Sequence, residues 1–353
     1  LALCTANLPS VDVIPSENFN PVIYTGNSST NAITVGFSPD MSWFKVRSEA
    51  GNHQLYDTVR GDSARLVPNA TTAEATSSNG FATFDVDGFT LDGGGGGGDV
   101  NTNGRTYVGW NWKAGGSASS NTNGTITSSV SANVDAGFSI VSYTGSGSAA
   151  TVGTGLSQRA DLIITKGRSD AGNWVTWHKD LTGAFASNGG YIYLDTTSAA
   201  STTTVFYDGT GFTSSVFKFR GGNGQVNQSS RTYISYCFHS VDGYSKAGSY
   251  KGTTVNAGSF VYTGFKVAFV LIKTMFDGDP WVMMDAARDP FNVVNKRLRS
   301  DSSAAETTDA QLTCDFLSNG FKPYGNSYHI NGNGQTYLYL AFAESPFKHT
   351  NAR

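Results

Sequence analysis

The chain has 353 residues, of which 39% are apolar, 12% aromatic and only 14% charged, and its formal net charge is −3. Ordinary domains carry about 25% charged residues, so this chain meets water largely through hydroxyl and amide groups, and its apolar content argues against disorder. It has no basic stripe and no apolar run of the ~18 residues that a membrane span needs, which argues against a nucleic-acid partner and against membrane insertion.

Residues 1–20 open the chain as a proline-rich segment, which predicts an extended N-terminal arm. After it, one series of segments occurs three times in the same order. Each copy has an aromatic residue before a small-residue turn, a hydrophobic run ending in Lys, an aromatic or His near an Asp, a Phe-containing strand, and a closing Thr-Tyr strand. The closing strands are NGRTYVGWNWK (103–113), SSRTYISYCF (229–238) and GNGQTYLYLAF (332–342). A repeat of roughly 100 residues is domain-sized and longer than a solenoid unit.

The shared segments alternate in period two, are rich in Val, Ile, Tyr, Phe, Trp and Thr, and are separated by Gly and Asn turns, so they predict short strands. We therefore expect an all-β chain of three tandem antiparallel β-sandwich domains, of jelly-roll or concanavalin-like type, related by an internal repeat. The strongest candidate for a helix is residues 285–298, which Pro290 interrupts.

The boundaries follow from composition. We expect a β-sandwich repeat 1 at 21–113, a Gly/Ser/Asn-rich linker at 114–136, repeat 2 at 137–245, repeat 3 at 246–345 and a C-terminal tail at 346–353. The linker has few large side chains, which predicts a flexible or wrapped first joint. Almost no chain separates repeats 2 and 3, which predicts a stiff second joint.

Candidate sites for chemistry are few. The glycine run at 92–99 has neither the Lys-Ser/Thr nor the helix of a phosphate loop, so a turn is favoured. The Arg-Gly-Asp-Ser sequence at 60–63 could suggest cell adhesion, but its place after a strand favours a turn. Asp85 and Asp87 are the nearest approach to a glycosidase pair, and a position beside a turn suits them better. Residues 145–148, Gly-Ser-Gly-Ser, lack the setting of a nucleophile elbow.

No pair among the five histidines has metal-ligand spacing. The three cysteines Cys4, Cys237 and Cys314 form neither a disulfide framework nor a zinc pattern, and Cys237 is expected to be a buried free thiol. We therefore predict no catalytic, cofactor-binding or metal-binding residues, no cofactor, and a protein that is not an enzyme. The ligand-binding residues stay unassigned.

The aromatic residues of the closing strands recur in all copies, which favours core packing over a sugar-stacking platform. They are Tyr107, Trp110, Trp112, Tyr233, Tyr236, Tyr337 and Tyr339. Four less regularly repeated tryptophans, Trp43, Trp174, Trp177 and Trp281, are better candidates for ligand contact, although core packing is favoured for them too.

Segments along nearly the whole chain resemble a family of virion-associated proteins of marine tailed phages, often labelled tail fibres. They are TANLP (5–9), YTGNSST (24–30), GFSPDMSWFKVRS (36–48), NTNGRTYVGWNWKA (101–114), GFSIVSYTG (137–145), VDGYSKAGSY (241–250), FVYTGFKVAFVLIK (260–273) and YLAFAESPFKHTNAR (339–353). In similar family members an SPRY-type, concanavalin-like sandwich often precedes TANLP. The six-glycine run and Cys237 depart from the family pattern. The resemblance offers no catalytic residues to carry over.

The resemblance implies a non-enzymatic structural or adhesive protein of the virion surface: a tail fibre, capsid fibre or decoration protein that contacts host surface glycans. The expected partners are copies of itself in a homo-oligomer, with a trimer as the usual state of phage fibres, and other virion proteins. Two alternatives stay open: a bacterial extracellular adhesin or filament subunit, and a carbohydrate-binding module or glycoside hydrolase.

Overall fold

The computed structural model describes residues 13–77, 79–93, 100–181, 185, 189–253, 258–325 and 327–346. All pairings between the named strands are antiparallel, and the helices of the described residues are short: η2 (Pro15–Glu17), η3 (Gly209–Gly211) and α2 (Tyr328–Asn331). The prediction of an all-β chain is confirmed. No helix in the described part of the chain has the length and apolar character to cross a membrane.

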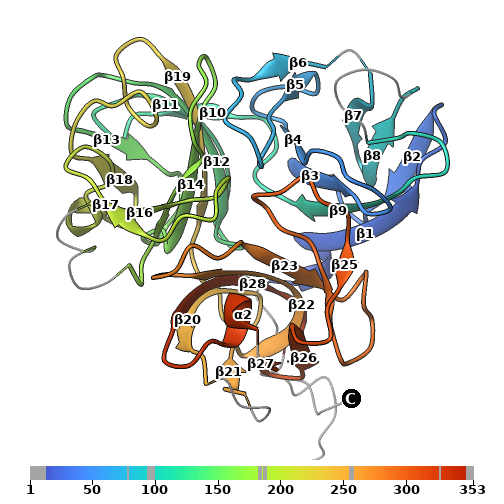
Figure 1. Ribbon diagram of the computed structural model, residues 1–353. Coiled ribbons are helices and arrows are strands. Elements are labelled where there is room, and N and C mark those ends of the chain that lie inside the picture. The colour runs from blue at the N-terminus through green and yellow to red at the C-terminus, as the bar shows by residue number, and fades with distance from the viewer. Residues whose placement is uncertain are drawn as a thin grey trace, which may run out of the picture.

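Three lobes meet around a common centre (Figure 1) and are called repeats 1, 2 and 3. Repeat 1 contains β1 (Phe19–Thr25), β2 (Asn31–Thr34), β3 (Met41–Val46), β4 (Gln54–Asp57), β5 (Ala64–Arg65), β6 (Ala75–Thr76), β7 (Phe81–Asp85), β8 (Gly88–Leu91) and β9 (Thr106–Trp112). Repeat 2 contains β10 (Ser119–Asn121), β11 (Ser128–Asn133), β12 (Phe138–Thr144), β13 (Ala150–Gly153), β14 (Leu162–Gly167), β15 (Val175–His178), β16 (Gly190–Tyr193), β17 (Ser201–Thr202), β18 (Val216–Phe219) and β19 (Thr232–Phe238). Repeat 3 contains β20 (Ser245–Lys251), β21 (Val261–Tyr262), β22 (Phe265–Thr274), β23 (Val282–Asp285), β24 (Lys296–Arg297), β25 (Thr307–Thr308), β26 (Thr313–Leu317), β27 (Gly320–Tyr324) and β28 (Thr336–Pro346).

The same strand order recurs in each repeat. The order β1-β9-β3-β4 of repeat 1 matches β20-β28-β22-β23 of repeat 3 and the run β12-β19-β14-β15 inside the eight-stranded sheet of repeat 2. A smaller sheet packs on one face of each: β2-β8-β7, β13-β18 and β21-β27-β26. The registers also match. In each repeat one residue of the strand second from the end of this order pairs with the closing strand on one side and with the end strand on the other. These sets are Met41 with Trp112 and Asp57, Leu162 with Phe238 and His178, and Phe269 with Phe342 and Asp285.

The recurring Thr-Tyr motif has a structural role in every repeat. The Tyr stacks on the aromatic residue of the first strand, with ring centroids 5.1–5.3 Å apart; the pairs are Tyr24–Tyr107, Tyr143–Tyr233 and Tyr250–Tyr337. The first hydroxyl of each pair donates to a carbonyl of the loop before the closing strand, and the second accepts a backbone N–H of that loop. The motif thus ties the two strands and the loop together where the chain turns.

A hydrophobic core lies between the repeats, in addition to the core inside each one. It contains aromatic side chains from all three, and Phe19 of repeat 1 stacks at 4.7 Å on Phe342 of repeat 3, which lies 5.9 Å from Phe238 of repeat 2. At the centre, a cavity of about 20 Å³ is lined only by hydrophobic side chains of the three repeats. Such a space is too small and too apolar to hold a polar ligand. The repeats therefore share one interior.

The segment expected as a linker, residues 114–136, contains β10 and β11, which extend the sheet of repeat 2 by pairing on β12. Its start is held by Asp40, whose carboxylate accepts the N–H groups of Ala114 at 2.7 Å and Gly116 at 3.3 Å. The polar composition that suggested a flexible chain belongs to two strands. β10 is the edge of the sheet, where Ser119 and Ser120 are exposed, and β11 lies next to it with Ser128, Val130 and Ser131 buried.

Residues 285–298 form no helix. Asp285 ends β23, and the chain then runs through turns to β24 at Lys296. The Asp285 and Arg288 side chains, three positions apart, resemble a helical ion pair in sequence, but here they form a buried pair inside a turn. The beginning and end of the chain, residues 1–12 and 347–353, lie outside the described residues, as does most of the glycine run.

Candidate functional site

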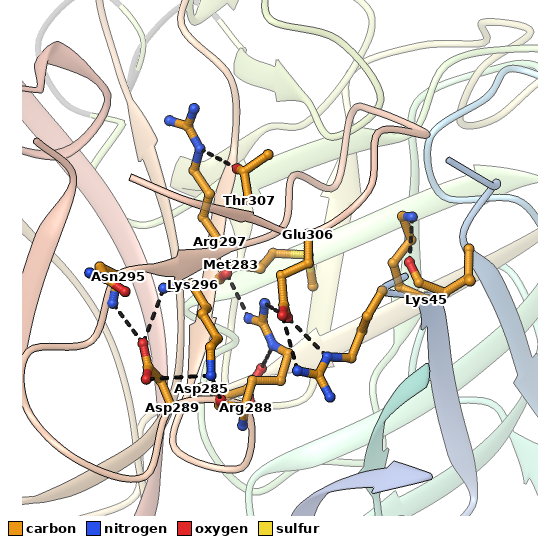
Figure 2. Close-up of polar contacts among 12 residues, drawn as sticks. Lys45, Met283, Asp285, Arg288, Asp289, Asn295, Lys296, Arg297, Glu306 and Thr307 are labelled. Atoms are coloured by element: carbon orange, nitrogen blue, oxygen red, sulfur yellow. Dashed lines mark hydrogen bonds and ion pairs between the residues drawn. The ribbon is translucent and has the colours of Figure 1, made fainter. Parts of the chain in front are cut away.

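A buried network of charges joins repeat 3 to repeat 1 (Figure 2). Arg288 donates from Nε to Asp285 at 2.6 Å and from Nη1 to Glu306 at 3.1 Å, and both side chains of the first pair are fully buried. Glu306 also accepts two 3.0 Å bonds from Arg47 of repeat 1. Asp285 accepts a further bond at 3.0 Å from the indole N–H of Trp110, again from repeat 1.

A second network of the same design joins repeat 1 to repeat 2. Arg60 contacts Asp57 at 2.5 Å and Glu74 at 3.2 Å, and Glu74 accepts two 2.8 Å bonds from Arg168 of repeat 2. Asp57 accepts a 2.7 Å bond from the hydroxyl of Tyr236, also in repeat 2. Tyr236 and Trp110 occupy equivalent positions in the closing strands, three residues after the Tyr of the Thr-Tyr motif. Trp110 pairs with Pro21 of β1, and Tyr236 pairs with Ile140 of β12.

The third joint, between repeats 2 and 3, keeps the geometry but replaces the charges. His178 stands where the other repeats have Asp57 and Asp285, and its Nε2 lies 3.3 Å from the carbonyl of Tyr339 in repeat 3. Leu181, three positions later, replaces the buried arginine, and the Ala200 N–H bonds to the Met275 carbonyl at 2.9 Å. In the other two joints the equivalent backbone N–H belongs to a glutamate: Glu306 donates to the Arg47 carbonyl, and Glu74 donates to the Arg168 carbonyl.

The ionisation of these groups follows from their surroundings. Burial alone would raise the pKa of Glu306, but the guanidinium groups of Arg47 and Arg288 outweigh it and lower this pKa. The pKa of Glu74 is lowered in the same way by the arginines of its own network. Burial lowers the pKa of His178 to about 4. The His178 ring is therefore neutral at pH 7, whereas the other two joints hold charged pairs.

Three buried lysines occupy equivalent positions near the ends of β3, β14 and β22, and burial lowers the pKa of each to about 8. Lys166 of repeat 2 donates to the Thr71 carbonyl of repeat 1 at 3.0 Å, and Lys273 of repeat 3 donates to the Thr197 carbonyl of repeat 2 at 3.0 Å. Lys45 donates to the Val46 carbonyl. Perturbed lysines suggest catalysis in other settings, but these ammonium groups are used to hold backbone.

The tryptophans that the sequence offered for ligand contact are all buried, two of them across joints and Trp177 in the core of repeat 2. Trp174 and Trp281 donate from their indole N–H to carbonyls of the preceding repeat, Val67 at 3.0 Å and Tyr193 at 2.7 Å. Trp43 donates to His53, and Trp177 is covered by Arg159 at 5.3 Å. All four are at most 5% exposed, so they cannot present a face to a ligand. The predicted core role of the closing-strand aromatics is confirmed, since all seven are buried.

The remaining motifs have structural settings. Arg60 of the Arg-Gly-Asp-Ser sequence is fully buried in its ion pairs, which rules out display of that sequence to a receptor. Asp85 and Asp87 flank the turn between β7 and β8, as predicted. Ser146 bonds to the Asn227 side chain in a turn. Of the glycine run, residues 94–99 lie outside the described residues.

The two described cysteines, Cys237 and Cys314, are free, buried thiols, as expected for Cys237, and burial raises the pKa of each. Among the described residues, no three His, Cys, Asp or Glu side chains are arranged to hold a metal ion.

Open clefts lie at the edges of the joints. One, of about 760 Å³, lies between the entering chain and β11 and contains Asp40, Lys113 and Asp135. Two adjoining clefts of about 300 and 360 Å³ share four lining residues and form one groove between β1 and repeat 3. The shared residues are Lys266, Ala286, Pro290 and Glu344. This groove could not be predicted from the sequence, because its walls come from opposite ends of the chain.

The fold defines an all-β protein in which three structurally similar repeats close around a shared core, with buried networks at the joints. The chain belongs to the family described as domain of unknown function DUF7483, whose model matches residues 14–346. One match spans all three repeats, so the family's unit is the whole three-lobed body. No curated protein and no solved structure matches the chain.

Proposed function

We propose that this chain is a non-enzymatic structural and adhesive protein of a tailed-phage particle, exposed on the virion surface as a tail fibre, capsid fibre or decoration protein. The observation that carries the proposal is the closed ring of three joints. Two buried ionic networks, one neutral joint and a shared aromatic core give a body with little internal freedom. A particle protein has to keep its shape outside the cell, where no chaperone can refold it.

The recurring strand order supports a finer description of the fold. Each repeat places a larger antiparallel sheet against a smaller one with aromatic residues between them. We propose that the repeats are three tandem β-sandwich domains of jelly-roll or concanavalin-like type that arose by internal repetition. This agrees with the family that the sequence resembles.

The proposed partners are other virion proteins, further copies of the chain, and a glycan on the host surface. One chain already supplies the three lobes that a homotrimer would supply from three chains (Figure 1). Any homo-oligomer would therefore use surfaces outside the three joints, because the joint side chains are buried against each other. The charged residues are largely paired within the chain, which suits a binding surface built from neutral groups.

The test is to locate the protein. Purified phage particles would be labelled with antibody raised against residues 138–346 and imaged, with mass spectrometry of the same particles. Label on tail or capsid fibres supports the proposal. Label on bacterial surface filaments, with none on particles, would contradict it and favour the adhesin or filament alternative. Hydrolysis of host polysaccharide by the purified protein would favour the glycoside hydrolase alternative.

A further inference from the structure

The groove between β1 and repeat 3 has at its rim one of the most exposed aromatic side chains in the described residues. Phe291 is 81% exposed, while it lines the groove together with Pro290 and the ion pair of Lys266 and Glu344. We propose that this groove binds a neutral oligosaccharide, with Phe291 stacking on a sugar ring and the groove's polar groups bonding its hydroxyls. The inference rests on the proposed adhesive function and names its ligand site.

The loop that carries Phe291 is fixed on both sides. Before it, the Asp289 carboxylate accepts the N–H groups of Asn295 at 2.9 Å and Lys296 at 3.1 Å (Figure 2). The Lys296 ammonium also donates to the Arg288 carbonyl at 2.7 Å.

After Phe291, the Asn292 amide donates to the Phe316 carbonyl at 3.0 Å and accepts the Phe316 N–H at 2.9 Å. An exposed aromatic on a mobile loop would lose conformational entropy on binding, and an anchored one avoids most of this loss. Phe291 is thus presented to solvent by a loop whose backbone is already ordered.

The charges of the groove select for a neutral ligand. Lys266 and Glu344 lie 2.8 Å apart, with about two-fifths of each side chain exposed, and Asp289 lies near Lys296 at 3.8 Å. Each charge therefore has a partner of opposite sign, and no excess charge is left to attract an anionic or cationic polymer. A paired ammonium and carboxylate still offer a donor and an acceptor, which is the combination that sugar hydroxyls require.

A protein partner fits the groove less well. Specific protein interfaces bury about 800 Å² on each side around a cluster of apolar anchors. Here one exposed aromatic stands beside paired charges in a cleft with a cavity volume within the range of small-molecule sites, about 300–1,000 Å³.

The test is binding of the full chain to an array of neutral hexose and N-acetylhexosamine oligosaccharides, with uronic-acid oligosaccharides on the same array. The wild-type protein is expected to bind neutral members. The Phe291→Ala variant is expected to bind them at least tenfold more weakly, and Glu344→Gln is expected to weaken binding as well. Both residues are exposed, so neither change should affect folding, and circular dichroism would check this.

The matched control is Phe276→Ala, which removes another exposed aromatic of repeat 3 that does not line the groove. Its binding should equal that of the wild type. No binding to neutral oligosaccharides, binding to acidic ones alone, or unchanged binding by Phe291→Ala would overturn the site. These outcomes are independent of the particle labelling, so a failure of the site can be told from a failure of the virion role.

Discussion

At the scale of the residue, the same few buried polar groups hold each repeat at equivalent positions. Each repeat has a fully buried asparagine before its closing strand. Its side-chain oxygen accepts the backbone N–H of the residue after the glycine that ends the first-strand segment. The asparagines are Asn101, Asn227 and Asn331. That glycine packs against the same loop, because a Cβ at Gly145 would lie 2.3 Å from the Gln228 carbonyl oxygen. Only glycine fits there, which explains the Tyr-Thr-Gly and Tyr-Lys-Gly segments.

Replacing Asn227 should test this arrangement. Its side chain accepts the Ser146 N–H at 2.8 Å and donates to the Ser148 carbonyl at 2.6 Å. Asn227→Ala leaves both groups without that partner, so we expect a loss of about 1–3 kcal/mol in the free energy of unfolding, measured by urea denaturation. Asn123→Ala, at an exposed turn, should change it little, and equal effects at the two sites would contradict the assignment.

His178 should make the joint between repeats 2 and 3 sensitive to acid. Its Nδ1 accepts the Asp180 N–H at 3.1 Å and its Nε2 faces the Tyr339 carbonyl, so only the neutral ring satisfies both contacts. Burial lowers its pKa to about 4 from 6.5, so the unfolded chain binds a proton first as pH falls through this window. The stability that His178 provides is therefore complete above pH 6.5 and lost towards pH 4.

The measurement compares wild type with His178→Gln by urea denaturation at several pH values. At pH 7 the variant should be less stable by about 1–3 kcal/mol. Because only the wild type loses the histidine contribution in acid, the difference should shrink as pH approaches 4. A difference that is constant from pH 7 to pH 4 would show that protonation of His178 plays no part.

At the scale of the element, the outer edge of the first strand is covered by another strand in repeat 2 and, among the described residues, left unpaired in repeat 1. In repeat 2, β11 covers β12, and Ile140 pairs with Ser131. In repeat 1 the equivalent position is Pro21. The backbone groups of Asn18 and Gly26 bond towards β9, and so do those of every second residue between them. Pro21 falls between these residues, so its backbone faces away from β9. A proline there removes the outward N–H that another strand would need.

Pro21→Val should therefore make the edge of β1 available for pairing. We expect concentration-dependent association of the variant, measured by size-exclusion chromatography with light scattering. The control is Val22→Ile, since the Val22 N–H faces β9 and stays bonded. Equal masses for Pro21→Val and wild type up to high concentration would contradict a protective role for the proline.

The strands and their repetition could be predicted from the sequence because period two and turn residues are local signals. The errors also came from local signals. Residues 114–136 have few large side chains, yet β10 needs none because it is the edge strand of the sheet. β11 adds only Val130 and small buried serines to a core whose large side chains come from elsewhere. Residues 285–298 are the strongest candidate for a helix in the sequence, but the chain forms turns there around the buried Asp285–Arg288 pair.

The joints and the groove could not be predicted in this way. Arg47 and Glu306, which form an ion pair, lie far apart in the chain, as do Asn20 and Glu344, which line the same cleft, and both sets come together only when the ring closes. The sequence also favoured burial for tryptophans such as Trp174 without showing that they bridge two repeats. Phe291 attracted no attention because a single Phe in a turn is an ordinary sequence feature until its exposure is known.

At the scale of the whole molecule, the ionic joints should be costly to break on one side. Arg60→Met leaves the Asp57 carboxylate buried without its cation, so we expect a loss of about 3–5 kcal/mol in the free energy of unfolding. Leu181→Met, at the equivalent position of the neutral joint, exchanges side chains of similar volume and should cost less than about 1.5 kcal/mol. Similar losses in urea denaturation would contradict the difference between the joints.

The shared core predicts that the repeats do not fold separately. Repeat 3 alone, residues 245–346, would expose Phe269 and Phe342, which are 1% exposed in the whole chain. We expect that fragment to lack a cooperative thermal transition by circular dichroism and the full chain to unfold in one transition. A well-folded, monomeric repeat 3 would show that its own core is sufficient.

The closure of the three joints also constrains how such a protein can change in length. In an open stack of repeats, a unit can be gained or lost at any point, because each one contacts only its neighbours in sequence. Here repeat 3 returns to repeat 1 through Arg47, Glu306 and Trp110, so a fourth unit would separate these partners and a missing one would leave them unpaired. The number of repeats is therefore fixed by geometry at three, and we expect changes in chain length to be tolerated only in the loops.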